Sequence, residues 1–143
     1  MGKHFFTPEQ EQQVIAAIQE AEKNTSGEIR VHIEPTTDKE AYERAQEVFF
    51  QLEMDKTAQQ NGVLFYVAYE SHLFAILGDK GIDAVVPDDF WQEEVDLVIR
   101  HFKEEQYAEG LSKAILEAGK KLKAYFPYQD DDINELSDEI SKG

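Results

Sequence analysis

The sequence contains no cysteine, which rules out disulfides, thiolate nucleophiles and cysteine-type zinc sites. Any metal ion must therefore be held by oxygen or imidazole ligands. Basic residues are also scarce, with 14 lysines and arginines against 30 aspartates and glutamates, a formal net charge of -16. Nucleic-acid binding needs a basic surface, so this balance argues against nucleic-acid partners and favours cations as ligands.

Long apolar stretches are missing as well. The longest apolar runs, such as residues 63–68, are far too short to cross a bilayer, and the first residues lack the apolar centre of a signal peptide. We therefore expect a cytoplasmic protein with no membrane segment. At 143 residues the chain has the length of one domain, which we place at residues 1–126, followed by a frayed or loosely docked acidic C-terminal tail, residues 127–143.

The spacing of apolar residues predicts alternating helices and strands. Thr7, Pro8 and Gln10 have the pattern of a capped helix start, and that helix should end near residues 24–27. Residues 28–34 alternate between polar and apolar, which predicts a strand near a sheet edge with one wetter face.

Further along, Asp38 should cap a helix that carries Glu40 and Arg44 as a weak surface pair. The β-rich runs at residues 61–69 and 71–78 should then form an antiparallel hairpin whose first strand is central. Helical periodicity follows from Phe90 to about residue 122. The expected fold is a three-layer αβα sandwich around a small mixed sheet.

Four aspartates follow the hairpin directly, at Asp79, Asp83, Asp88 and Asp89. Their spacing does not match an EF-hand loop, but calcium also accepts irregular sets of six to eight oxygen ligands, including backbone carbonyls. The alternative is solvated charge, with Asp88 or Asp89 capping the helix that follows.

A second polar segment, residues 52–62, precedes the central strand and contains Glu53 and Asp55. In an antiparallel hairpin, the start of the first strand and the end of the second lie at the same end of the sheet. This segment and the aspartate-rich loop should therefore be neighbours, which would combine two weak acidic stretches into one cluster.

Motifs for other chemistry are missing. The four histidines include no HExxH pair, and we expect His32 and His72 to be exposed or satisfied by neighbours rather than to act as ligands or catalysts. There is also no GxSxG elbow and no phosphate-binding P-loop.

Five segments in order resemble the TPM domain family: "TSGEIRVHIEP", the helix with Arg44, "NGVLFYVA", "FAILGDKGID" and "FKEEQYAEGL". The resemblance covers about residues 9–125. It implies an αβα fold with a four-stranded central sheet, hence one short strand that periodicity does not reveal. It also implies a site for one or two divalent ions, calcium first and magnesium second. Its ligands would come from Asp79, Asp83, Asp88 and Asp89, together with Glu53 or Asp55.

Three functions stay open from the sequence. The preferred one is a metal-responsive, stand-alone metal-binding domain without catalytic activity. The second is a metal-dependent hydrolase, because the resemblance includes plant proteins described as acid phosphatases; Lys80 and Arg44 would then hold the phosphate. The third is an interaction module in which metal-ordered loops present Phe90 and Trp91 to an unidentified protein partner.

Overall fold

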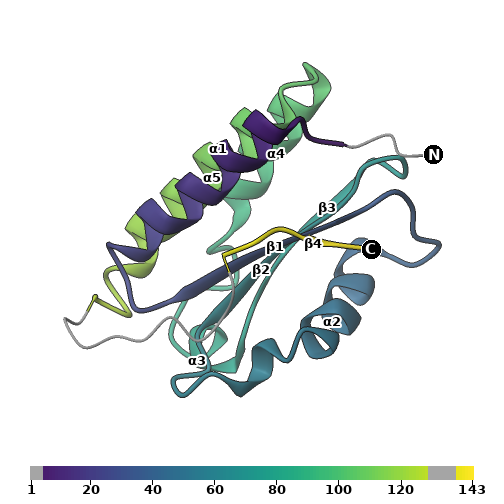
Figure 1. Cartoon of the computed structure of the whole chain (residues 1–143). Coiled ribbons are helices and arrows are strands. Elements are labelled where there is room, and N and C mark those ends of the chain that lie inside the picture. The colour runs from purple at the N-terminus through teal and green to yellow at the C-terminus, as the bar shows by residue number, and fades with distance from the viewer. Residues whose placement is uncertain (1–4, 129–137) are drawn as a thin grey trace.

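A computed structural model describes residues 5–128 and 138–143, which form three layers. Helices α1, α4 and α5 cover one face of a central sheet and α2 covers the other (Figure 1). The predicted αβα sandwich is therefore confirmed. The elements, in chain order, are α1 (Pro8–Glu22), β1 (Glu28–Glu34), α2 (Ala41–Gln51), the 3-10 turn η1 (Met54–Lys56), β2 (Gly62–Ala68), β3 (Leu73–Gly78), α3 (Lys80–Asp83), α4 (Gln92–Lys103), α5 (Tyr107–Leu122) and β4 (Ser141–Lys142).

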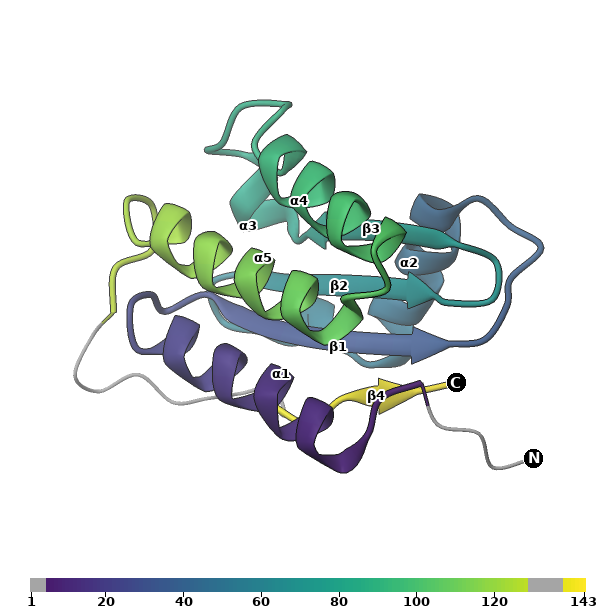
Figure 2. The ribbon, with the colours of Figure 1, turned by 90° about the horizontal axis from the view of Figure 1, so that it is seen from above.

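The sheet has four strands in the order β3-β2-β1-β4. Strands β2 and β3 form the predicted antiparallel hairpin, and β1 is parallel to both of its neighbours, β2 and β4. Figure 2 shows β4, from the end of the chain, lying beside β1. This strand of two residues is the fourth strand implied by the family resemblance.

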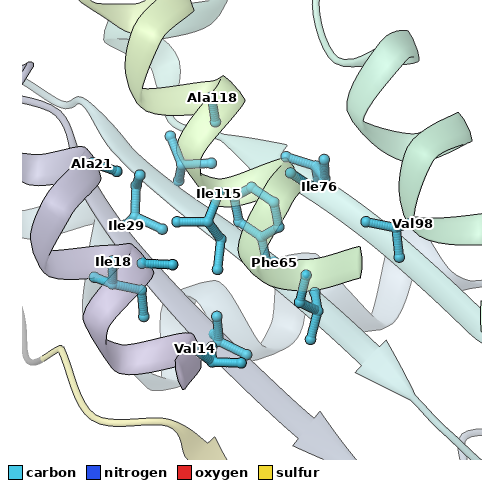
Figure 3. Packing of buried hydrophobic residues seen from close by; sticks show 14 of the residues in the cluster. Val14, Ile18, Ala21, Ile29, Phe65, Ile76, Val98, Ile115 and Ala118 are labelled. Atoms are coloured by element: carbon cyan, nitrogen blue, oxygen red, sulfur yellow. The ribbon is translucent and has the colours of Figure 1, made fainter. Parts of the chain in front are cut away.

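Strand β2 is apolar without interruption because both of its faces are buried. Val63, Phe65 and Val67 belong to the larger core, beneath α1, α4 and α5, whereas Leu64 and Tyr66 belong to the smaller core beneath α2. Figure 3 shows part of the larger core, where side chains of α1 and α5 meet those of the sheet. Successive side chains of a strand point to opposite faces, so one run of residues supplies both cores.

Helix α1 begins as predicted. The Thr7 hydroxyl accepts a hydrogen bond from the Gln10 backbone N–H at 3.1 Å, and the Gln10 side chain accepts one from the Thr7 N–H at 2.8 Å. The predicted helix α2 is present, but its predicted cap was wrong, because Glu40 rather than Asp38 occupies the N-cap position and makes no capping hydrogen bond with its side chain.

Strand β1 lies near a sheet edge as predicted, with only the two-residue strand β4 outside it, but the predicted wetter face was wrong. Glu28, His32 and Glu34 are each only 5 % exposed. Strand β4 covers the outer edge of β1, and the Gly143 N–H donates a hydrogen bond to the Ile33 carbonyl at 2.9 Å. Residues 138–143 of the expected tail are thus docked, while residues 129–137 lie outside the described part of the chain.

Within the described residues, no helix is long and apolar enough to cross a membrane.

Candidate functional site

The two acidic loops meet at one end of the sheet, as the hairpin prediction required. The Asp79 N–H donates to the Gly62 carbonyl at 2.9 Å, and the Gly81 N–H donates to the Gln60 carbonyl at 2.9 Å. These two backbone hydrogen bonds join the loop after β3 to the segment before β2. We call this junction, residues 59–62 and 78–83, the loop junction.

Asp79 occupies the centre of the loop junction. Its side chain caps α3, with Oδ1 accepting a hydrogen bond from the Lys80 N–H at 2.7 Å. The residue is only 7 % exposed, and no described residue hydrogen-bonds its other oxygen, Oδ2, which is buried. A buried carboxylate oxygen without a partner is costly, so this atom has unused capacity to bind a cation or a water molecule.

Two backbone carbonyl oxygens lie very close to Gly81, two residues after Asp79. A Cβ atom placed on Gly81 would lie 2.3 Å from the Gln59 carbonyl oxygen and 2.6 Å from that of Gln60. Only glycine permits so close an approach, and Gln60 itself has a left-handed backbone, with φ of 51°. Backbone carbonyl oxygens are among the ligands that calcium accepts together with carboxylates.

Asp83 ends the short helix that Asp79 begins. Partial desolvation of its carboxyl, followed by the negative charge of Asp79, raises the pKa of Asp83 above its ordinary value. The charge of Asp79 therefore disfavours ionisation of Asp83, and a bound cation would relieve that repulsion.

The other four predicted ligands are less closely gathered. Glu53 is exposed and forms an ion pair with Lys56 at 3.1 Å, and Asp55 lies in η1. Asp88 and Asp89 are exposed in the turn before α4. Across residues 5–128 and 138–143, no group of three or more histidines, aspartates and glutamates is arranged to hold a metal ion.

Asp88 and Asp89 are solvent-exposed, as the alternative interpretation expected, but the helix-capping role that it gave them was wrong. Trp91 occupies the N-cap position of α4, and no side chain caps that helix. The aspartate that does cap a helix in this region is Asp79, on α3.

Only the interaction-module hypothesis required Phe90 and Trp91 to face a partner. Instead Trp91 packs partly buried against the larger core, and Phe90 is only 7 % exposed. The indole Nε1 of Trp91 is buried without a described hydrogen-bond partner, and it lies 3.5 Å from where a Cβ on Gly78 would be. The only tryptophan of the chain is thus next to the residue that precedes Asp79.

A second polar cluster, which no motif in the sequence predicted, is buried where β1 ends. Glu34 accepts hydrogen bonds from Arg44 Nε at 2.8 Å and Nη2 at 2.9 Å, from the Tyr66 hydroxyl, and is 3.2 Å from His32 Nε2. The Arg44 hydrogen bonds are the main reason that the pKa of Glu34 falls to about 2, against the opposing effect of burial.

This cluster corrects the expectation for Arg44. The guanidinium pairs with Glu34 and Glu47 rather than with Glu40, and it is thereby engaged within the fold rather than available to a phosphate. His32 is buried and satisfied, with Nδ1 2.9 Å from the Ser141 hydroxyl. The signal in the sequence was the i, i+2 spacing of His32 and Glu34, which places both side chains on one face of β1.

These observations define a class of protein: an αβα domain in which two acidic loops are joined at one end of the sheet. The TPM domain family matches residues 2–121, so the chain belongs to that family. None of the curated proteins matches the chain at a significant level.

Several solved structures are similar to this one, including the following three. The NMR structure of the BA42 protein from the psychrophilic bacterium Bizionia argentinensis is 49 % identical, with a TM-score of 0.93, and the match covers 100 % of this chain and 99 % of that one.

The other two share the fold at low identity. The N-terminal domain of the cg2496 protein from Corynebacterium glutamicum is 12 % identical with a TM-score of 0.61, covering 96 % of this chain and 81 % of that one. The N-terminal domain of a protein from P. gingivalis is 18 % identical with a TM-score of 0.68, covering 87 % and 82 %.

Proposed function

We propose that this TPM domain binds one or two divalent cations at the loop junction, calcium in preference to magnesium, and that binding orders the two loops. The observation that carries the proposal is the buried Oδ2 of Asp79, which has no partner among the described residues. An ion there would be held by Asp79 and Asp83 with carbonyl oxygens of residues 59–60. Glu53, Asp55, Asp88 and Asp89 are the further carboxylates within these loops.

Calcium is preferred over magnesium because of the kind of ligands present. Magnesium requires near-ideal octahedral geometry and gives up its water reluctantly, whereas calcium accepts carbonyl oxygens in irregular arrangements. The two carbonyl oxygens close to Gly81 are an irregular arrangement of this type, which suits calcium. The net charge of -16 also favours the approach of cations.

A metal-responsive function follows from where these ligands lie. They come from two segments separated by the whole β2–β3 hairpin, so one ion bound to both segments would lower the mobility of each. The same ion would neutralise the repulsion between Asp79 and Asp83.

Calorimetric titration of the chelator-treated protein with calcium chloride and magnesium chloride tests the proposal. We expect heat and a higher Tm with calcium, and a weaker response with magnesium. Asp79→Asn should abolish the response while keeping the helix cap, since asparagine caps helices as well as aspartate. Asp38→Asn, an exposed aspartate before α2, is the matched control and should bind as the parent does.

Terbium, which replaces calcium at oxygen sites, reports the location independently. Excitation of Trp91 should produce terbium luminescence because the indole lies beside the loop junction. Calcium should quench that signal by competition. Heat of binding without any terbium luminescence would place the ion elsewhere and overturn the assignment.

The alternative function is metal-dependent hydrolysis of phosphate esters. Of the two residues expected to hold the phosphate, Arg44 is already paired with Glu34. Lys80, exposed beside Asp79, remains. We expect no phosphomonoesterase activity above background with or without calcium. Activity that disappears in both Asp79→Asn and Lys80→Gln would instead establish the hydrolase.

A further inference from the structure

A cavity of about 350 Å³ opens at the end of the sheet opposite to the loop junction. It lies where β2 ends, beside the β2–β3 turn, and under the connection between α4 and α5, which Figure 2 shows passing over that end of the hairpin. Its volume falls within the range of small-molecule sites in proteins, about 300 to 1,000 Å³.

Aromatic rings form much of the cavity wall. Tyr69, Phe74, Phe102 and Tyr107 all line it. The rings hold one another in place: Phe102 and Tyr107 are 5.0 Å apart between centroids and Phe74 and Phe102 are 6.1 Å apart. Phe5, which does not line the cavity, stacks on Tyr69 with the two ring centroids 4.4 Å apart. These contacts preform flat apolar walls that suit a planar ring.

The charge at the cavity is opposite to that of the molecule as a whole. Among the described lining residues Lys103 supplies an ammonium group and His72 an imidazole, and no carboxylate lines the space. Within the described part of the chain, Lys103 forms no ion pair, and it is exposed. The exposed Glu104 and Glu105 follow it in sequence but do not line the cavity.

Helix α5 adds positive potential on the same side. Tyr107 is its first residue, and the side chain of Gln106, in the N-cap position, makes no capping hydrogen bond. The amino end of a helix of 16 residues carries a partial positive charge, which stabilises a nearby anion.

From this combination we propose that the cavity binds a small aromatic carboxylate, with its ring between the aromatic walls and its carboxylate at Lys103. Aromatic walls by themselves would also accept an organic cation. The ammonium group of Lys103 disfavours a cation and pairs with an anion, so charge decides between them.

Three phenyl compounds of the same size test this assignment by amide NMR of the full chain: phenylacetate, the neutral phenylacetamide and the cationic 2-phenylethylamine. We expect phenylacetate to shift amides within residues 68–74 and 99–107. It should bind about threefold to fivefold more tightly than phenylacetamide, as an exposed ion pair allows, and 2-phenylethylamine should bind most weakly.

Variants of Lys103 separate charge from shape. Lys103→Gln should remove the advantage of phenylacetate over phenylacetamide, and Lys103→Arg should keep it. The matched control is Lys120→Gln, at the far end of α5, which should change nothing. Equal affinity of all three compounds, tighter binding of the amine, or the absence of shifts in both residue ranges would each overturn the proposal.

Discussion

Glu34 is a buried carboxylate whose charge is stabilised by Arg44, Tyr66 and His32. Its side chain is 7 % exposed, so the surrounding water offers little stabilisation if a partner is lost. Removing one partner of a buried ion pair leaves an uncompensated charge, which costs about 3 kcal/mol or more.

Arg44→Met should therefore lower the free energy of unfolding by about 3 kcal/mol, measured by urea denaturation at pH 7. The matched control is Lys39→Met, which removes an exposed ion pair to Glu47 and should lower the free energy of unfolding far less than Arg44→Met does. Equal losses in the two variants would mean that the Glu34 pair is no stronger than a surface pair.

The pH dependence of Glu34 follows from its pKa of about 2, which lies below the ordinary value of 4.5. The stabilisation is complete above the ordinary pKa and is lost as the pH falls through the folded-state pKa. Urea denaturation of the parent should show a loss of stability from about pH 4.5 down to pH 2 that Glu34→Gln does not show. Parallel curves for the two proteins would contradict the account.

Glu22 behaves in the opposite way. Burial, a hydrogen bond with the Asp138 side chain and the charge of Asp138 raise the pKa of Glu22 to about 9, and the Ile29 N–H that donates to it at 3.1 Å offsets only part of this. The folded state keeps a proton that the unfolded state has released, so stability falls as the pH rises from 4.5 towards 9.

Glu22→Gln should remove this fall and make the protein more stable than the parent at pH 8, by about 1 kcal/mol or more. The same substitution at the exposed Glu20 should leave the pH profile of the parent unchanged. Thermal denaturation between pH 5 and 9 measures both, and a lower Tm for Glu22→Gln at pH 8 would contradict the predicted proton on Glu22.

At the scale of elements, α1 and α5 lie side by side on the sheet (Figure 2) and approach each other closely at Gly119. A Cβ atom on Gly119 would lie 2.7 Å from the Cβ of Ala21 and 2.9 Å from its Cα. Contact with a backbone atom cannot be relieved by turning a side chain, so the two helices would have to move apart.

Gly119→Ala should consequently destabilise the protein by about 1–3 kcal/mol, although helix propensity alone would favour alanine by about 1 kcal/mol. The sign of the change in Tm therefore tests the packing directly. Lys120→Ala, on the exposed side of the same helix, isolates propensity and should leave Tm nearly unchanged.

Local patterns predicted most of these elements. The capping box at Thr7 and the two β-rich runs carry their information in neighbouring residues, so α1, β2 and β3 were predictable. Strand β4 was not, because two residues have no periodicity of their own and pair only with a strand that is distant in the sequence. The same distance hid the burial of His32, which depends partly on Ser141.

The candidate site was predictable in its position but less so in its details. Hairpin geometry placed Asp79 beside residues 59–62, and the hydrogen bonds confirm it. The partnerless Oδ2 of Asp79 and the close carbonyls at Gly81 arise from how the chain packs, which composition does not reveal. Arg44 was misassigned because i, i+4 spacing identifies neighbours within a helix, whereas its main partner lies on β1.

At the scale of the whole molecule, a net charge of -16 makes the folded state repel itself, and cations bound to carboxylates reduce that repulsion. Saturation with calcium at about one hundred times Kd should add about 2.7 kcal/mol to stability, equivalent to a rise in Tm of about 8 °C for a chain of this size. Sodium chloride of equal ionic strength is the control, since it screens charge without filling the site.

Calcium titration of the full chain followed by amide NMR tests the central claim most directly. We expect shifts concentrated at residues 53–62 and 78–90, while the cavity residues 99–107 at the opposite end stay unchanged. These shifts should be lost in Asp79→Asn but kept in Asp38→Asn. Saturable shifts elsewhere, or none at the loop junction, would contradict it.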